Sequence, residues 1–452
     1  MTVHLPRREE FAELLRLALP VAAVQVGMML LGVVDTIMVG HVSPQDLAGV
    51  ALGNIYFFAC AVFGMGLLFA LDPVVSQAVG AGDAEGAARA VQRAILLAVA
   101  LAGTASVLLA VAEPLLVLAR QPGEVIPLAA GYARATIPGL LPFYLFLVFR
   151  QTLQAQGRVL PILAAMAVAN LANVFFNWVL VYGNLGFPAL GAVGSGWASS
   201  MSRGVMAGGL LVIGWSLLRG QLLPFRREAL RPRPLGRMLR VGVPIGAQMG
   251  MEYGAFGLAG VLIGVLGTVS MAGHQIALNL SALTFMVPLG VSQATAVLVG
   301  RGVGAADPDR ARRAALGGLL VGAGFMLVTM VIFFLIPEKL ARIYSSDLPV
   351  VALAASLLPI AALFQVFDGL QVVAMGVLRG VGDTRIPMIL NLLGFWVAGL
   401  PVGVALAFRG SMGAQGLWWG LALGLAVVAL LLLVRIRFRL AGELHRLQVE
   451  DD

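Results

Sequence analysis

Four acidic residues lie inside long apolar stretches of this sequence, where a carboxylate is costly to keep ionised. They are Asp35, Asp72, Glu252 and Asp368, whereas most of the 22 acids lie in short polar segments or near the ends. An ionised carboxylate in a bilayer core costs at least ~2.5–3.5 kcal/mol, so it needs a partner, a cavity or a bound cation. Reversible binding of a proton or a metal cation is the chemistry that these residues can perform.

Two of these acids are expected at a similar depth in the membrane. Glu252 follows the last arginine of a basic segment, Arg240, by roughly 18 Å of helix, and Asp368 precedes Arg379 by roughly 16 Å. Asp35 is expected nearer the opposite face, in the other half of the chain. Each half therefore has at least one acid that we expect to be buried.

A structural hydrogen bond or salt bridge is the alternative role for these acids. The sequence places only one basic residue, Arg203, inside an apolar segment, so we expect that the acids cannot all be paired. A coupling role is favoured for Asp35, Glu252 and Asp368. Asp72 precedes Pro73 near the end of its segment, and a structural role is favoured there because proline disturbs the helical backbone.

Two stripes of polar side chains accompany the acids. Helical spacing of three and four places Asn170, Asn173 and Asn177 on one face. Their amides either complete a cation site with Asp35 or hold helices together. The second stripe consists of His274, Gln275 and Asn279, where ordinary hydrogen bonding between helices is favoured.

The elements that carry these residues are transmembrane helices. Of the 452 residues, 60% are hydrophobic and 12% charged, so the bilayer must be the solvent. Segments of ~20 apolar residues fall at about twelve places: 14–40, 48–78, 94–119, 128–149, 159–182, 191–218, 238–266, 271–300, 315–337, 348–378, 386–408 and 413–434. The single cysteine, Cys60, excludes an intramolecular disulfide, and no nucleotide-binding or paired catalytic motif is present, so neither a cofactor nor an enzyme is expected.

The arginines indicate the orientation. Alternating loops carry 24 of the 30 basic residues on one side, five on the other, and Arg203 within a segment. Basic loops stay in the cytoplasm, so both termini are expected there. The net charge of +8 thus reflects topology and not nucleic-acid binding.

The second half of the chain repeats the first. A shift of 224 residues aligns Pro20 with Pro244, and VGAGDAEGAARA (79–90) with VGAADPDRARRA (303–314). We therefore expect an all-α polytopic protein with two parallel six-helix bundles around a central cleft. The expected domains are an N-terminal lobe, a basic cytoplasmic linker that lies along anionic headgroups, and a C-terminal lobe with its tail: 1–218, 219–237 and 238–452.

Five segments together resemble a known family. They are VVDTIMVGHVS (33–43), ALDPVVSQAVGAGD (70–83), LANVFFNWVLVYG (171–183), MAGHQIALN (271–279) and FQVFDGLQVVAMGVLRGVGDT (364–384). In this order they resemble the MATE (multidrug and toxic compound extrusion) transporters, most closely the NorM-like bacterial branch. The resemblance covers essentially the whole chain.

The resemblance implies an antiporter that uses an inward Na⁺ or H⁺ gradient to export drugs, often amphipathic organic cations. By motif position, Glu252 and Asp368 match the cation-binding acids of the C-lobe, where Na⁺ is a candidate ligand. The matching positions in the N-lobe are Asp35, Asn173 and Asn177. The branch often has a tyrosine where this chain has Phe364, and the missing hydroxyl leaves the choice between Na⁺ and H⁺ open.

The expected partners are the exported compounds, the coupling cation and membrane lipid, with no obligate protein partner. Residues that would line a tolerant cleft, or simply pack, are Phe256, Gln275, Asn279, Phe285, Met286 and Phe364. Two alternatives remain. An exporter of one specific metabolite would have the same architecture, whereas a flippase for lipid-linked precursors would need a basic cleft.

Overall fold

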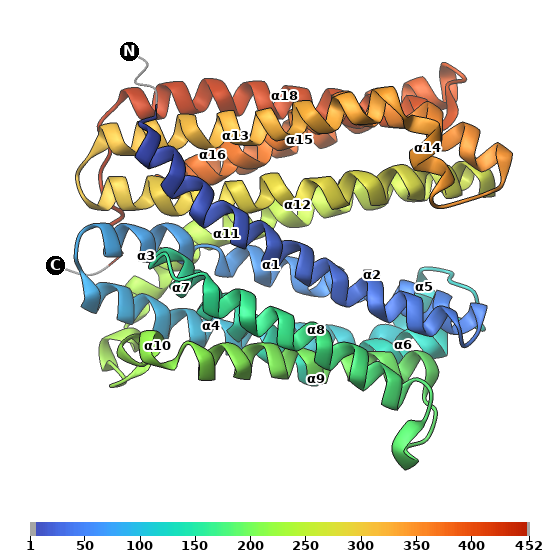
Figure 1. Ribbon diagram of the computed structural model, residues 1–452, viewed down its shortest axis with the longest axis horizontal. Helices are drawn as coiled ribbons and strands as arrows, with labels where there is room; N and C mark the ends of the chain where they lie inside the picture. Colours follow the sequence, from blue (N-terminus) through green and yellow to red (C-terminus); the bar gives the residue numbers. More distant parts are fainter. Residues whose placement is uncertain (1–5, 450–452) are drawn as a thin grey trace. The chain divides into compact units, whose positions relative to one another are not determined.

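The structure is a computed structural model that describes residues 6–449, and all regular secondary structure in this range is helical (Figure 1). The described residues form two compact units. The N-unit combines Val24–Gly246 with residues 448–449, and the C-unit combines residues 6–23 with Ala247–Leu447. The all-helical fold that the sequence predicts is thereby confirmed.

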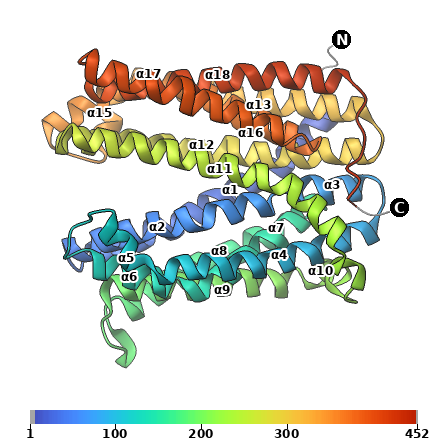
Figure 2. The ribbon, with the colours of Figure 1, turned by 180° about the vertical axis from the view of Figure 1, so that it is seen from behind.

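The N-unit contains most of the first helix and every element up to the linker. Its helices are α1 (Arg8–Gly40, from Val24 on), α2 (Pro44–Leu68), α3 (Leu71–Gly80), α4 (Ala84–Ala110), α5 (Ala112–Leu118), α6 (Ile126–Ala135), α7 (Ile137–Ala155), α8 (Leu160–Leu180), the short η1 (Asn184–Gly186), α9 (Gly191–Ile213), α10 (Trp215–Leu222) and η2 (Arg227–Leu230). Helix α10 is bent by 90° from α9 and contacts α4 (Figure 2).

The C-unit contains most of α11 (Pro232–Val265) and the elements after it. These are α12 (Thr268–Gly304), α13 (Pro308–Leu335), α14 (Pro337–Arg342), α15 (Leu348–Gly380), α16 (Arg385–Leu392), the π-helical η3 (Leu393–Gly399), α17 (Leu400–Val404), the π-helical η4 (Ala405–Arg409) and α18 (Gly413–Ala441). Segments α16 to η4 form one continuous stretch of 25 residues that is apolar enough to span a membrane.

The helix boundaries confirm the repeat. An offset of 224 residues carries the first residue of α1 onto that of α11, the first residue of α2 onto that of α12, and the first residue of α4 onto that of α13. The interior prolines Pro20 and Pro244 occupy matching places in α1 and α11. The two halves of the sequence therefore encode the same order of helices.

Helices α1 and α11 are each divided between the two units. The residues of α1 up to Ala23 belong to the C-unit, and the residues of α11 up to Gly246 belong to the N-unit. Each division follows the interior proline, which removes a backbone hydrogen bond and loosens the helix at that place. The boundaries between the two units therefore fall inside α1 and α11, whereas the sequence predicts that the two lobes are separated at the linker.

The described helices account for most of the expected spans. Within residues 6–449, nine helices are long and apolar enough to cross a membrane, or up to eleven if two bent pairs each count as one span. Helix α11 is not among them, although its 34 residues are about 51 Å long at 1.5 Å per residue. The chain is a multi-pass membrane protein, and the number twelve stays a prediction.

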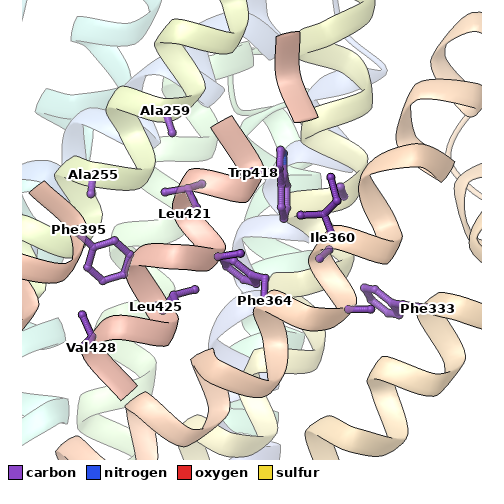
Figure 3. Packing of buried hydrophobic residues seen from close by; sticks show 14 of the residues in the cluster. Ala255, Ala259, Phe333, Ile360, Phe364, Phe395, Trp418, Leu421, Leu425 and Val428 are labelled. Atoms are coloured by element: carbon purple, nitrogen blue, oxygen red, sulfur yellow. The ribbon is translucent and has the colours of Figure 1, made fainter. Parts of the chain in front are cut away.

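The C-unit has a core of aromatic and aliphatic side chains contributed by α11, α15, η3 and α18 (Figure 3). Phe364 lies at its centre, with ring centroids 5.9 Å from Phe256 and 5.5 Å from Trp418. Phe256 also contacts Phe395 at 5.8 Å. These contacts fix the helices that carry the acids of the C-unit.

Candidate functional site

Three helices of the N-unit bring polar side chains to one buried carboxylate. Asp35 of α1 is 3% exposed. Its Oδ1 accepts hydrogen bonds from the amides of Asn173 at 3.0 Å and Asn177 at 2.7 Å, both on α8. Its Oδ2 accepts a bond of 2.5 Å from the hydroxyl of Ser199 on α9. Hydrogen bonds to a charged group are stronger than neutral ones, so these three donors offset part of the cost of burying the carboxylate.

The spacing on α8 explains which asparagines reach Asp35. Asn173 and Asn177 are one helical turn apart, and the Asn177 amide also donates to the carbonyl of Asn173 at 2.9 Å. Asn170 instead donates to the carbonyls of Gly27 at 3.1 Å and Met166 at 3.0 Å. Two members of the predicted stripe therefore meet the acid, and the third ties α8 to α1.

Arg203 adds a positive charge to this site. It lies one turn beyond Ser199 on α9, is 9% exposed and attracts Asp35 electrostatically. Its guanidinium carbon is 3.9 Å from the ring centroid of Phe57 and 5.6 Å from that of Phe143. Aromatic faces stabilise a desolvated guanidinium, which is how this cation is held away from water.

The C-unit has a second site built from different helices. Glu252 of α11 is partly buried, and its two oxygens accept hydrogen bonds from Gln371 of α15 at 3.3 Å and Asn391 of α16 at 3.4 Å. Asp368 lies one turn before Gln371 and is 7% exposed. The carboxyl groups of Asp368 and Glu252 are close enough to repel each other when both are ionised, so a proton or a cation between them is favoured.

Both sites contain amide oxygens that lack a hydrogen-bond donor. Among the described residues, the buried side-chain oxygens of Asn173, Asn177, Gln371 and Asn391 have no partner. A buried acceptor without a donor costs about 1–3 kcal/mol, and a hard cation would satisfy it because carboxylate and carbonyl oxygens are the ligands that such ions take. In the same range, no three His, Cys, Asp or Glu side chains gather as a metal site. The carboxylate and amide oxygens of the two sites are hard donors, of the kind that Na⁺ takes, and the carboxylates can also take up H⁺.

Three members of these sites are absent from the sequence-based prediction: Ser199, Gln371 and Asn391. The sequence contains a signal for Gln371, because this residue follows Asp368 by three positions and shares its helix face. Ser199 and Asn391 lie on helices without an acid, so only the folded arrangement identifies them.

The residues expected in a cleft fall into two groups. Phe364 is 2% exposed and belongs to the core of the C-unit, with Phe256 packed against it. Gln275 is exposed on α12, whereas the other three are partly buried on the same helix: Asn279, Phe285 and Met286. The neighbouring His274 accepts a hydrogen bond of 3.2 Å from Trp418, as expected for a contact between helices.

Two further arginines of the N-unit are buried besides Arg203. Arg93 and Arg150, which lie within α4 and α7, are 0% and 1% exposed. Arg150 donates to Gln25 at 2.7 Å, and Arg93 donates to the carbonyl of Glu228 at 3.0 Å. The sequence assigns both to basic loops, but these contacts draw them into the N-unit.

A comparison with protein families gives one match in each half of the chain. The family model MatE matches residues 20–179 and again residues 244–405. The multidrug resistance protein PmpM of Pseudomonas aeruginosa is 38% identical over 98% of this chain and 95% of its own length. The multidrug resistance protein MdtK of Pectobacterium atrosepticum is 35% identical over 95% of each chain.

Solved structures agree with the fold. The crystal structure of the eukaryotic MATE transporter AtDTX14 superposes with a TM-score of 0.88 at 24% identity, covering 96% of this chain and 99% of that one. A MOP superfamily transporter from Pyrococcus furiosus gives 0.86 at 20% identity, with 96% of each chain covered. At this identity the likeness supports the helical arrangement alone.

Proposed function

The chain belongs to the MatE family, and from that premise we propose that it is a cation-coupled antiporter that exports small, often cationic and amphipathic compounds. Relatives named multidrug resistance proteins are 33–38% identical over nearly the whole chain, which supports drugs or toxic compounds as cargo. The expected setting is the bacterial inner membrane, with the basic loops in the cytoplasm.

One observation supports the coupling most directly. Each unit holds a carboxylate that accepts amide hydrogen bonds and is surrounded by amide oxygens without donors. Such a group is costly to leave ionised and unpaired at membrane depth. Binding and release of Na⁺ or H⁺ at these acids is the chemistry that this environment favours.

The two sites differ in charge, and we assign the coupling cation first to the C-unit. Glu252 and Asp368 repel each other, and no arginine or lysine forms an ion pair with either among the described residues. Asp35 already has three hydrogen-bond donors and the attraction of Arg203. Asp35 therefore needs a coupling cation less than the acid pair does.

Transport follows from competition for these carboxylates. When the sites face outward, Na⁺ or H⁺ neutralises an acid, and a cationic cargo loses its attraction and leaves. When the sites face inward, loss of the ion restores a negative charge that attracts the next cation. A ligand shifts such an equilibrium only by its differential affinity for the two states, and the acids supply that difference.

Ethidium efflux tests this proposal. Proteoliposomes with separately imposed Na⁺ and pH gradients are compared for wild type, Asp35→Asn, Glu252→Gln and Asp368→Asn. We expect gradient-driven efflux in wild type and at least a tenfold loss in Glu252→Gln and Asp368→Asn, with a smaller loss in Asp35→Asn. Glu338→Gln is the matched control, since Glu338 is exposed and pairs only with Arg342 on its own helix.

The outcomes separate the alternatives. Wild-type efflux that persists in all three variants contradicts coupling through these acids. A wild type that moves no ethidium under either gradient contradicts multidrug export and favours a single metabolite or a lipid-linked precursor as cargo. The gradient that drives efflux identifies the ion.

A further inference from the structure

A cavity of about 490 Å³ lies at the beginning of α11, and no residue of either acidic site lines it. It is lined by Pro232, Arg233, Gly236, Arg237 and Arg240. Three of the five lining residues are arginines, and no acid is among them. The transport chemistry proposed above makes no use of this cavity.

Helical spacing gathers the three arginines on one face of α11. Arg233, Arg237 and Arg240 follow each other by four and three residues, which is the spacing of neighbours on a helix surface. Arg233 and Arg240 are exposed, and Arg237 is partly buried. The side chains that line the cavity thus include three cations, which favour an anionic ligand.

The linker before α11 is held firmly against α4, so the cavity lies on a fixed support. The amide of Gln92 donates to the carbonyls of Gln221 at 3.1 Å, Leu222 at 3.2 Å and Pro224 at 3.0 Å. The Gln92 side-chain oxygen accepts a bond of 2.8 Å from the backbone N–H of Arg226. Side chains that are already positioned lose less entropy when a ligand binds.

An ion pair reinforces this attachment. The guanidinium of Arg226 donates two bonds to Glu85, at 2.6 and 3.0 Å. These bonds raise the pKa of Arg226 above its ordinary value. Arg226 thus anchors the linker, whereas the three arginines that line the cavity belong to α11.

Apolar side chains beside the cavity face outward. Leu223, Phe225 and Leu230 are 57%, 52% and 58% exposed, within ten residues of Arg233. Exposed large apolar groups beside arginines are typical of a segment at the membrane interface. A lipid offers both a headgroup for the arginines and acyl chains for these side chains.

We propose that Arg233, Arg237 and Arg240 form a binding site for the phosphate of an anionic phospholipid. Arginine forms paired hydrogen bonds with phosphate oxygens, and the arginine bias of the sequence places this face at the cytoplasmic leaflet, where anionic lipids attract basic residues. The exposed apolar neighbours favour a lipid over a soluble phosphate. The site is independent of the proposed transport cycle.

Native mass spectrometry of the full-length protein in detergent tests this site. Phosphatidylglycerol or phosphatidylcholine is titrated onto wild type and onto R233Q/R237Q/R240Q, and the retained lipid is counted. We expect wild type to retain phosphatidylglycerol selectively. The triple variant should need at least about tenfold more lipid to reach the same retention, because each arginine near a membrane surface adds to the attraction for anionic lipid. Phosphatidylcholine retention should be equal in both.

The matched control is R219Q/R227Q/R231Q, which removes three exposed arginines of the same linker that do not line the cavity. It should retain phosphatidylglycerol as wild type does. An equal loss in both triple variants would overturn the proposal, because diffuse attraction alone would then explain retention. If the cavity variant fails to fold, the single change Arg240→Gln replaces it, with Arg231→Gln as its control and the same two criteria.

Inorganic phosphate distinguishes the two sources of a phosphate group. Inorganic phosphate at a concentration equal to that of the lipid should leave phosphatidylglycerol bound to wild type. Displacement of the lipid by an equal concentration of phosphate would overturn the lipid assignment and identify a site for a soluble anion.

Discussion

At the scale of residues, the two acidic sites differ in how their charge is stabilised. Asp35 has three side-chain donors and a nearby guanidinium, whereas Glu252 has two longer amide contacts and an acidic neighbour. Short bonds to an ionised group are worth about 1.5–3 kcal/mol each. The N-unit site should therefore contribute to stability when no cation is bound, and the C-unit site should gain stability from its cation.

Ser199→Ala tests the first of these statements. The change removes the 2.5 Å bond to Asp35, so we expect a loss of about 1–2 kcal/mol in the free energy of unfolding, seen as a lower melting temperature in detergent. Ser202→Ala is the control, because that hydroxyl donates only to the carbonyl of Ala198 on its own helix. Equal melting temperatures for the two variants would contradict the role of Ser199.

The acids and two of the asparagines could be predicted from the sequence because their polarity conflicts with the apolar segments around them. Ser199 and Asn391 could not, since a serine or asparagine in a membrane helix carries little cost and many such residues are present. Phe364 shows that residue type alone can also suggest a role that the packing does not support. Its type fits a drug-binding surface, but its neighbours Phe256 and Trp418 enclose it in the core.

At the scale of elements, close packing of glycines determines how α18 approaches its neighbour. A side chain at Gly420 would meet the backbone of Gly403 on α17 and the carbonyl of Gly399 in η3. Small residues let helix backbones approach closely in lipid. This contact holds the stretch from α16 to η4, including Asn391, against α18.

Gly420→Ala should therefore destabilise the C-unit. The added methyl group meets backbone atoms that cannot rotate away, so we expect a loss of about 1–3 kcal/mol and a lower melting temperature. Gly324→Ala on α13 is the control, because its methyl group meets nothing within 4 Å. A melting temperature of Gly420→Ala equal to that of Gly324→Ala would show that the helices tolerate separation here.

Apolar segments predicted most of the elements, and the offset of 224 residues predicted that the two halves share one order of helices. It did not predict the interruption between α2 and α3 at Phe69 and Ala70, nor the π-helical segments η3 and η4. Apolar composition continues through each of these places. Hydropathy reports which residues prefer lipid and carries no information about the register of backbone hydrogen bonds.

At the scale of the whole molecule, the arginine bias predicts which loops face the cytoplasm. Cysteine labelling in intact cells tests it, because Cys60 is the only native cysteine and can be replaced by alanine. In that background, Phe187→Cys should react with a membrane-impermeant maleimide, since Phe187 is 55% exposed in a loop without basic residues. Arg227→Cys should react only after permeabilisation. The reverse pattern would contradict the assigned orientation.

The first turns of α1 contact residues that are synthesised long after them. Glu10 pairs with Arg313 and Glu13 with Arg310, at separations of 303 and 297 residues. At a ribosomal rate of roughly 5–20 residues per second, these partners emerge roughly 15–60 s later. Helix α1 must therefore enter the bilayer and keep its orientation before these partner residues exist, guided by its own flanking charges. Its docking against α13 must wait until that helix has been made, and a nascent chain truncated before α13 should leave the first turns of α1 open to proteolysis.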